Sequence, residues 1–324
     1  MRARAKSGAG VQGSAKEPTV PDHASQPLLS ILVPAYRYAD GVARILAGLA
    51  PWPSEACEVL VFDDSPDDAV ADVVRNFNAC GGCRADYRHN TPALGAVPNW
   101  NALIAAARGR HVWLLHHDEF PIGKYFVDRL LARLGATDAA DVLLLDCLLA
   151  DAASGRNRRH LPAAMRLALA RHAPCYLYRR NVIGPASALI VRRAHYPVFE
   201  PQLRWLVDVD AYAQLLQVRG IRVDLAVDLQ VGSVLARQDS ITATLQPGLA
   251  RLEQAERRWL RQQRSAATPW LQSSRQSAST RLMLFGEGLL WALWRLGSRC
   301  PWWLGFSALP REHVRQALLR GRST

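Results

Sequence analysis

From Leu28 onward the chain alternates short runs of β-branched or apolar residues with segments of helical periodicity. Strands are predicted over residues 30–36, 58–65, 85–90, 111–119 and 141–151, and helices over 40–50, 67–78 and 98–108. Parallel strands need a crossover connection, usually a helix, so this alternation is typical of βαβ units. We therefore predict an α/β fold built on an open, mainly parallel sheet flanked by helices.

The helical segments show recognisable ends and faces. In the first predicted helix Asp40 is expected to act as the N-cap, and the apolar face consists of Val42, Ile45, Leu46 and Leu49. A later helix begins near Asp208 and Asp210 and ends at Gly220, which suits a helix C-terminus.

Length and composition favour a globular core with loose ends. The 324 residues are 49% hydrophobic, enough for one large domain or two modest ones. Residues 1–27 are basic and rich in Gly, Ser, Ala and Pro, so a disordered tail is predicted there, with no secretory signal. The six scattered cysteines indicate a reducing cytoplasm, and Cys80 with Cys83 is only a weak zinc motif.

The net charge is +12, from 40 Lys and Arg residues against 28 acidic ones. Such a surface favours anionic partners such as nucleotide phosphates or an anionic membrane face. No helix-turn-helix, zinc-finger or RNP-type motif is present, so nucleic acid is not expected as a partner.

Polar residues follow the predicted strands where each strand ends. In open α/β sheets, ligands bind beyond the carboxyl ends of the strands. The residues at these ends are Pro34, Ala35 and Tyr36, then Asp63, Asp64 and Ser65, then Asn90, and finally His116 to Glu119. The clustering indicates a ligand site, although any single member could instead cap a helix.

Glycine-rich phosphate cradles are missing from the sequence. Neither GxGxxG nor GxxxxGK[ST] occurs, so phosphates would have to be held by a metal ion, by arginines, or by both. The stretch HHDE, residues 116–119, suits the first option, because Mg²⁺ or Mn²⁺ binds one or two carboxylates together with phosphate oxygens. If the strand continues, Asp118 and Glu119 point to opposite faces of the sheet, so only one of them would bind the metal directly, and we favour Asp118. His116, two residues before Asp118, would lie on the same face as Asp118. A polar strand end without metal is the alternative.

Several motifs resemble family 2 glycosyltransferases of the GT-A fold. They are SILVPAYRYADGVARILAGL, VLVFDDSPDD, NTPALGAVPNWNALIAAARGRHVWLLHHDEF, NVIGPASALIVRR and WLVDVDAYAQLLQVRG, between Leu28 and about Thr242. Their order and spacing carry the resemblance, which covers about two thirds of the chain.

The resemblance implies roles for individual residues. Pro34, Ala35 and Tyr36, with Asp63 or Asp64, would line the pocket for the base and ribose of a sugar-nucleotide donor. Asn90 and Asn99 would belong to the same nucleotide-sugar site. The family's acidic motif maps onto Leu115 to Glu119, with the metal-binding aspartate at Asp118 and further metal candidates at His116 and Glu119.

A catalytic carboxylate is also implied. The family's base maps onto Asp208 of LVDVD, and Asp210 is the second candidate. An inverting transferase needs one carboxylate to take the proton from the acceptor hydroxyl as it attacks the anomeric carbon. Either aspartate could instead cap the helix or favour its dipole.

Three positions depart from the family pattern. His116 replaces the first acid of the acidic motif, Glu119 replaces the last, and Arg237 stands where many relatives have a histidine. An arginine cannot coordinate a metal but can clamp a phosphate, so we count Arg237 as a donor-binding candidate and expect weaker metal dependence or partial replacement of the metal charge.

The carboxyl-terminal part is predicted to be a separate helical extension. We place the glycosyltransferase domain at residues 28–245 and a Trp-rich extension at 246–324. Within it, residues 281–306 fit either an interfacial segment on an anionic membrane or a helical hairpin packed on the domain.

The resulting functional prediction is a nucleotide-sugar glycosyltransferase of polysaccharide biosynthesis, acting on a glycan or lipid-linked acceptor with Mg²⁺ or Mn²⁺. It would be cytoplasmic, with peripheral attachment at the inner face of the cytoplasmic membrane as one option. The alternative from another class is a catalytically silent scaffold of the same fold that binds nucleotide sugars or membranes.

Overall fold

The computed structural model describes residues 26–151, 157–159, 163–235 and 245–264. Its strands are β1 (Leu29–Ala35), β2 (Cys57–Asp63), β3 (Ala85–His89), β4 (His111–Leu114), β5 (Glu119–Ile122), β6 (Val142–Asp151), β7 (Asn157–Arg159), β8 (Leu189–Arg192) and β9 (Val223–Leu235). Its helices are α1 (Ala39–Leu49), α2 (Ala69–Ala79), α3 (Ala96–Ala106), α4 (Phe126–Gly135), α5 (Ala163–His172), α6 (Val207–Leu216) and α8 (Leu249–Gln263). Short 3₁₀ helices lie at η2 (Pro174–Tyr178), η3 (Ala186–Ala188), η4 (Arg193–His195) and η5 (Gln246–Gly248).

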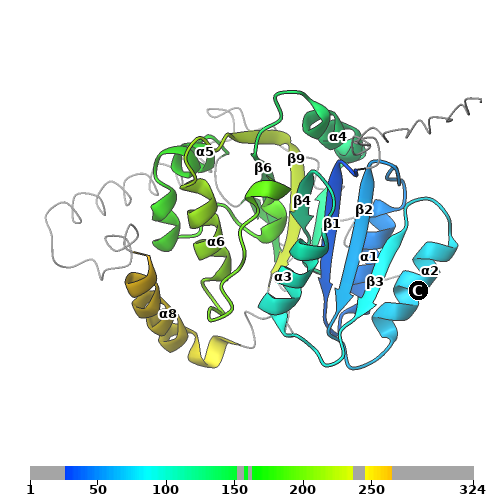
Figure 1. The fold of residues 1–324 in the computed structure, drawn as a ribbon, viewed down its shortest axis with the longest axis horizontal. Helices are drawn as coiled ribbons and strands as arrows, with labels where there is room; N and C mark the ends of the chain where they lie inside the picture. Colours follow the sequence, from blue (N-terminus) through cyan, green and yellow to red (C-terminus); the bar gives the residue numbers. More distant parts are fainter. Residues whose placement is uncertain (1–25, 152–156, 160–162, 236–244, 265–324) are drawn as a thin grey trace, which may run out of the picture.

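One sheet organises the molecule, with strand order β3-β2-β1-β4-β8-β6-β9-β5 and β7 beside β6. The strands β3, β2, β1 and β4 are parallel. α1 and α2 pack together on one face of this part, and α3 lies on the other (Figure 1). Every residue of β1 and β2 is buried, as expected for parallel strands covered on both faces. The predicted α/β fold class is confirmed.

Beyond β4 the sheet is mixed. β8 pairs antiparallel with both β4 and β6, and β5 pairs antiparallel with β9, whereas β6 and β9 are parallel. The mainly parallel arrangement predicted for the sheet therefore describes the β3-β2-β1-β4 half.

The predicted strand over 111–119 is interrupted, which corrects the prediction. β4 ends at Leu114, and the Glu119 amide donates to the His116 carbonyl at 2.9 Å, closing a turn. The chain then enters β5, where Glu119 pairs with Ser233 of β9. HHDE is thus a turn between two strands with different partners, so alternation along one strand does not set the directions of Asp118 and Glu119.

The first helix keeps its predicted face but not its predicted cap. Val42, Ile45, Leu46 and Leu49 are all buried. Asp40 lies inside the first turn, and α1 begins after Tyr38 without a side-chain capping bond, so the assignment of Asp40 as N-cap was wrong. As an acid in the first turn it still suits the helix dipole.

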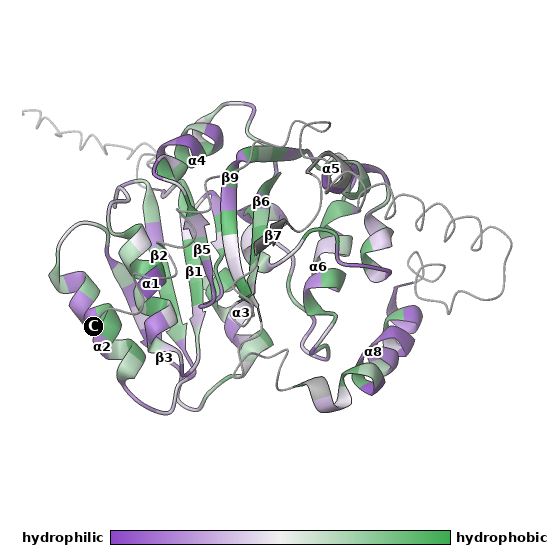
Figure 2. Ribbon diagram, turned by 180° about the vertical axis from the view of Figure 1, so that it is seen from behind, coloured by the Kyte–Doolittle hydropathy of each residue, from purple (hydrophilic) through white to green (hydrophobic). Residues whose placement is uncertain are grey.

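Hydropathy separates the core from the last helix. Figure 2 shows hydrophobic residues along the central strands, whereas hydrophilic residues dominate α8. Within the described ranges, no helix is long and apolar enough to cross a membrane. Residues 1–25 of the tail predicted at 1–27, and the Trp-rich segment 281–306, lie outside the described residues.

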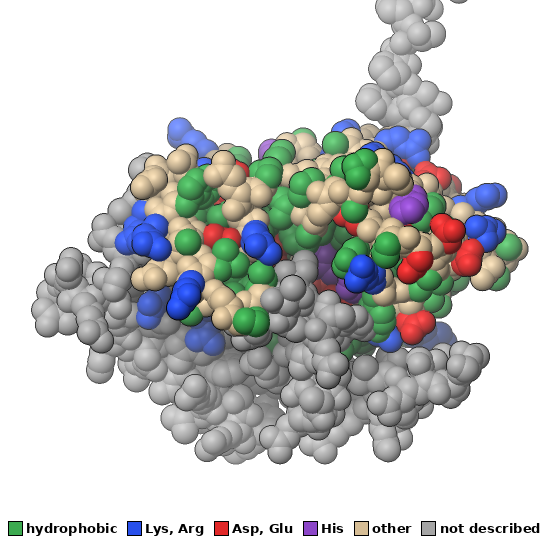
Figure 3. Space-filling view, turned by 90° about the horizontal axis from the view of Figure 1, so that it is seen from below, with side chains coloured by type: hydrophobic (Ala, Val, Ile, Leu, Met, Phe, Trp, Pro, Cys, Tyr) green, Lys and Arg blue, Asp and Glu red, His purple; other side chains and the backbone are tan. Residues whose placement is uncertain are grey.

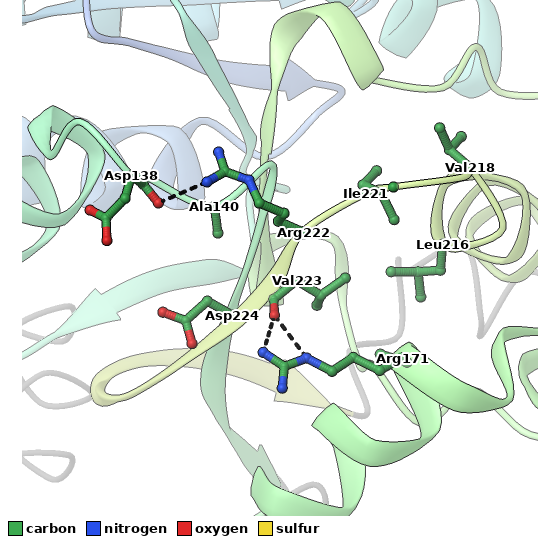
Figure 4. Close-up of a pocket in the computed structure, with 11 residues that line it drawn as sticks. Asp138, Ala140, Arg171, Leu216, Val218, Ile221, Arg222, Val223 and Asp224 are labelled. Carbon is green, nitrogen blue, oxygen red and sulfur yellow. Dashed lines mark hydrogen bonds between the residues drawn. The ribbon is translucent and has the colours of Figure 1, made fainter.

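A pocket of about 600 Å³ lies at the amino ends of β6 and β9, opposite the carboxyl ends of β1, β2 and β4 (Figure 4). Its arginines are bound to backbone carbonyls: Arg171 donates to Val223, and Arg222 donates to Asp138 and Ala139. Because these guanidinium groups already have partners, this pocket is a weak candidate for the ligand site that the strand ends predict.

Candidate active site

The carboxyl ends of the parallel strands form the face seen in Figure 3, where histidine and acidic side chains lie near one another. Pro34 and Ala35 are buried in the last part of β1, and Tyr36 beyond them is 50% exposed. The Asp64 amide donates to the Ala35 carbonyl at 3.0 Å, and the Arg37 amide donates to Ser65 Oγ at 2.8 Å. The structure therefore brings the predicted residues at the ends of β1 and β2 side by side.

Asp63 is fully buried at the end of β2. Its Oδ1 accepts the Ser65 amide at 2.8 Å, and its Oδ2 accepts the Tyr87 hydroxyl at 2.9 Å. Burial and the hydrogen bond to Asp63 raise the pKa of Tyr87 above its ordinary value. Both carboxylate oxygens of Asp63 thus shape the turn after β2.

Asp64, next along the chain, organises the loop after β3. Its Oδ1 accepts Asn90 Nδ2 at 2.9 Å and the Leu94 amide at 3.0 Å, and its Oδ2 accepts the Gly95 amide at 2.9 Å. Asn90 Nδ2 also donates to Asn99 Oδ1 at 3.2 Å. The buried Asn90 Oδ1 has no hydrogen-bond partner among the described residues. The predicted residues Asp64, Asn90 and Asn99 therefore form one network, with one oxygen left over.

The HHDE turn is held by Glu119, which is 3% exposed. Its Oε2 accepts the amides of His116 at 2.9 Å and Ser187 at 3.2 Å, and its Oε1 lies 3.5 Å from His116 Nδ1. Both oxygens are engaged, so these contacts favour an organising role for Glu119 over direct metal ligation. Asp118 is half-buried, and its carbonyl accepts the Val234 amide of β9 at 3.0 Å.

His116 lies between this turn and α3. Its ring centroid is 4.8 Å from that of Trp100, and its Nε2 is buried without a hydrogen-bond partner. Burial lowers the pKa of His116, but the charge and hydrogen bond of Glu119, together with Asp208 and Asp118, outweigh it and raise the pKa to about 9. At neutral pH His116 is therefore a cation.

Asp208 lies in the first turn of α6 and faces this cation. Burial and the charge of Glu119 raise its pKa while the His116 cation lowers it, and the resulting pKa is about 6. Its Oδ1 is buried and has no hydrogen-bond partner. A carboxylate with this basicity and a free oxygen has the properties of a general base.

Asp210 has a different environment, although it is two residues away. It is 1% exposed, and its oxygens accept the Tyr178 hydroxyl at 2.7 Å, Gln214 Nε2 at 2.8 Å and two Arg264 nitrogens at 2.9 Å each. Arg264 belongs to the end of α8. The four hydrogen bonds favour a structural role for Asp210.

Comparison with known proteins identifies the domain. Residues 30–188 match the family described as Glycosyl transferase family 2. The chain contains a family 2 glycosyltransferase domain. No curated protein matches the sequence significantly.

Solved structures support the fold of this glycosyltransferase domain. S. aureus TarS 1–349, crystallised with UDP-GlcNAc, matches with a TM-score of 0.53 and 18% identity, over 66% of this chain and 60% of that one. A longer S. aureus TarS structure matches with a TM-score of 0.50 and 18% identity, over 71% of this chain and 39% of that one. The matched region thus spans less than two thirds of these proteins, and at this identity the likeness concerns the GT-A fold.

The glycosyltransferase domain also contains site residues that sequence reasoning missed. Ser187 is fully buried and Tyr212 is 3% exposed, and the Ser187 Oγ and the Tyr212 hydroxyl have no partner among the described residues. Burial and Asp208 raise the pKa of Tyr212 and of Tyr196. Tyr212 follows Asp208 by four residues, so the two side chains share one face of α6. This spacing is the sequence signal that could have pointed to Tyr212.

Arg237 lies outside the described residues, so its place relative to the glycosyltransferase site stays a prediction. In the part of the chain that the structure describes, no group of three or more His, Cys, Asp or Glu side chains is arranged to hold a metal ion. A site that takes one carboxylate from Asp118 and the remaining oxygens from a donor diphosphate would still suit Mg²⁺ or Mn²⁺.

Proposed function

We propose that the domain transfers a sugar from a nucleoside-diphosphate sugar to a hydroxyl group of a glycan or lipid-linked acceptor, with inversion at the anomeric carbon. The observation that carries this proposal is Asp208, a half-buried carboxylate with a pKa of about 6 and an oxygen without a partner. Family membership supplies the reaction class, and the basicity of Asp208 supplies the group that accepts the acceptor's proton.

The donor would bind along the carboxyl ends of β1, β2 and β3. Tyr36 is exposed there, and the buried network of Asp64, Asn90 and Asn99 fixes the surrounding loops. Loops joined by these hydrogen bonds support an organised pocket for the base and ribose. This arrangement makes Asp64, Asn90 and Asn99 supports of the pocket, with Asn90 Oδ1 as the atom left to contact a ligand.

The donor diphosphate would lie near His116 and Asp118. The His116 cation is a positive charge that a diphosphate would meet at neutral pH. Asp118 would hold a divalent metal together with phosphate oxygens, and that metal would neutralise charge on the departing nucleotide. With its two oxygens engaged, Glu119 would orient His116 and the turn. Arg237 would add a second phosphate contact.

The net charge of +12 supports an anionic membrane surface or a lipid-linked acceptor as partner. Polysaccharide biosynthesis and peripheral attachment to the inner face of the cytoplasmic membrane would suit such an acceptor. The segment 281–306, predicted as the membrane-facing candidate, lies outside the described residues.

The test combines donor binding with turnover. Thermal unfolding is measured with UDP, GDP, dTDP and CMP, each with and without Mn²⁺, for the wild type, for Asp118→Ala and for Asp40→Ala, which removes an exposed acid. We expect one nucleotide to stabilise the wild type and Asp40→Ala in a Mn²⁺-dependent way, and Asp118→Ala to lose that dependence. The corresponding nucleotide sugar should then release nucleotide in the presence of acceptor. Binding without any sugar transfer would favour the scaffold, and absence of both would contradict the proposal.

A further inference from the structure

The start of α6, which carries Asp208, is bound by an acid from α8. Glu256 is 4% exposed, and its Oε1 accepts the amides of Arg204 at 2.6 Å and Trp205 at 3.2 Å. Its Oε2 accepts the amides of Trp205 at 3.2 Å and Leu206 at 2.8 Å. One carboxylate thus binds three consecutive amides immediately before α6.

These amides need an outside partner. α6 begins at Val207 after Leu206, which has no side-chain acceptor, and no side chain of the helix itself caps this end. The bond to the Leu206 amide, at the N-cap, is buried, and a buried amide without a partner is costly. A negative charge also suits the positive end of the helix dipole. Glu256 meets both needs from a segment 50 residues later in the sequence.

A second set of contacts connects the end of α8 with the same helix. Arg264 Nε and Nη2 donate to the two oxygens of Asp210, each at 2.9 Å. Arg257 donates to the Tyr178 carbonyl, and the Tyr178 hydroxyl donates to Asp210. Leu260 of α8 is fully buried and belongs to the hydrophobic core. Figure 1 shows α8 beyond α6 at the end of the molecule.

Asp208 lies between the two attachment points. Glu256 binds the backbone amides of residues 204–206, and Arg264 binds the side chain of Asp210, so α8 holds the chain on both sides of Asp208. Neither α8 residue contacts the HHDE turn in the described contacts, and α8 lies outside the matched residues 30–188. Their influence on the reaction would therefore act through the position of Asp208.

We propose that α8 belongs to the catalytic unit and that Glu256 and Arg264 are positioning residues that hold Asp208 against the acceptor site. The inference rests on the proposed role of Asp208 as base. It extends the functional unit past residue 245 to Arg264. A base displaced by a fraction of an ångström loses much of its effect on the chemical step. The proposed base and ribose site at the ends of β1 to β3 receives no side chain from α6 or α8 in the described contacts, so most of the donor binding should be kept.

The experiment uses the full chain with three substitutions in α8. Glu256→Ala removes the acceptor, and Glu256→Gln keeps the shape and one acceptor oxygen. Glu253→Gln is the matched control, since Glu253 pairs with Arg257 on its own helix and does not bind the amides of α6. Thermal unfolding shows that each variant is folded, and Glu256→Gln carries the test if Glu256→Ala is not.

Two readouts follow. Amide hydrogen exchange of residues 204–206 should accelerate at least about tenfold in Glu256→Ala, less in Glu256→Gln and little in Glu253→Gln. The kcat for sugar transfer should fall about tenfold or more in Glu256→Ala, while the donor KM changes less than about twofold.

The outcomes separate this inference from the proposed function. Faster exchange with an unchanged kcat would overturn the positioning role, and unchanged exchange would overturn the cap itself. A parallel loss of donor affinity would also overturn it, because that pattern indicates general damage. A wild type that transfers no sugar from any donor would overturn the proposed function and the catalytic part of this inference, and exchange would still decide whether Glu256 caps α6.

Discussion

Asp208 and Asp210 are two residues apart on α6, yet Asp208 has a buried oxygen without a partner while Asp210 accepts four hydrogen bonds. Two residues rotate a helix by roughly 200°, so the two carboxylates leave α6 on nearly opposite sides. One side meets His116 and Glu119, and the other meets Tyr178 and Arg264. The packing of α6 therefore assigns a different task to each aspartate.

Asparagine substitutions at these two positions should have opposite effects. Asp208→Asn removes the base and should lower kcat by about 10²–10⁴-fold while donor binding stays near wild type. Asp210→Asn breaks the pair with Arg264, whose side chain is 24% exposed, and should cost about 2 kcal/mol of stability. Turnover, donor calorimetry and urea unfolding of both variants check this. An active, destabilised Asp208→Asn together with an inactive, stable Asp210→Asn would reverse the assignment.

The rate of transfer should depend on the protonation of Asp208. Its pKa of about 6 lies above the ordinary aspartate value of 3.8, so kcat/KM should fall as the pH drops through about 6, when the carboxylate gains a proton. Because the pKa of Asp208 is higher in the folded protein than in the unfolded chain, Asp208 contributes to the free energy of unfolding at pH values below about 3.8. That contribution is lost as the pH rises through about 6. At neutral pH Asp208→Asn should therefore be no less stable than wild type. A flat kcat/KM between pH 7 and pH 5, in protein that remains folded, would contradict this role.

His116 should make stability depend on pH in the alkaline range. Its folded pKa of about 9 exceeds the ordinary value of 6.5, because Glu119 and the neighbouring acids outweigh burial. The contribution is fully present below about pH 6.5 and is lost as the pH rises through about 9. Urea unfolding at pH 6, 7.5 and 9 should show a decline on the order of 2 kcal/mol that His116→Gln removes. His172→Gln, at an exposed position, should keep the decline.

Local patterns predicted the parallel half of the fold well. The period of Val42, Ile45, Leu46 and Leu49 predicted the buried face of α1, because a helix on a sheet buries one stripe. The interruption after Leu114 was missed, since the run HVWLLHHDEF reads as one strand. The chain turns there because Glu119 starts a new strand that pairs with Ser233 of β9, more than 100 residues later.

The sequence predicted only part of the candidate site, because some of its contacts also come from distant segments. Strand ends placed Asp63, Asp64 and Asn90 at one edge, because parallel strands share their carboxyl side. The family resemblance favoured Asp208 over Asp210, but no local pattern supplied a physical reason for that order, because the pairing of Asp210 with Arg264 comes from a distant segment. Glu256 resembled any other acid of a charged helix, because nothing local distinguishes a buried capping carboxylate from a solvated one.

Gly41 should be required for the HHDE turn to sit against α1. A Cβ at this position would lie 2.2 Å from the His117 carbonyl oxygen and 2.2 Å from the Tyr38 ring, so both groups, or α1 itself, must move. The His117 carbonyl belongs to the turn that carries His116 and Asp118, and Tyr38 contacts the His117 ring edge-on at 5.3 Å. We expect Gly41→Ala to cost about 1–3 kcal/mol and to lower transfer activity, because overpacking shifts backbone as well as side chains.

Gly48 offers a matched control on the same helix. A Cβ there meets nothing within 4 Å, so Gly48→Ala should leave activity unchanged and raise stability by up to about 1 kcal/mol, since alanine favours a helix over glycine. Urea unfolding and kcat/KM are measured for Gly41→Ala and Gly48→Ala. If Gly41→Ala and Gly48→Ala behave alike, the contact between α1 and the turn does not constrain the site. If Gly41→Ala alone loses activity and stability, the first turn of α1 fixes the position of His116 and Asp118.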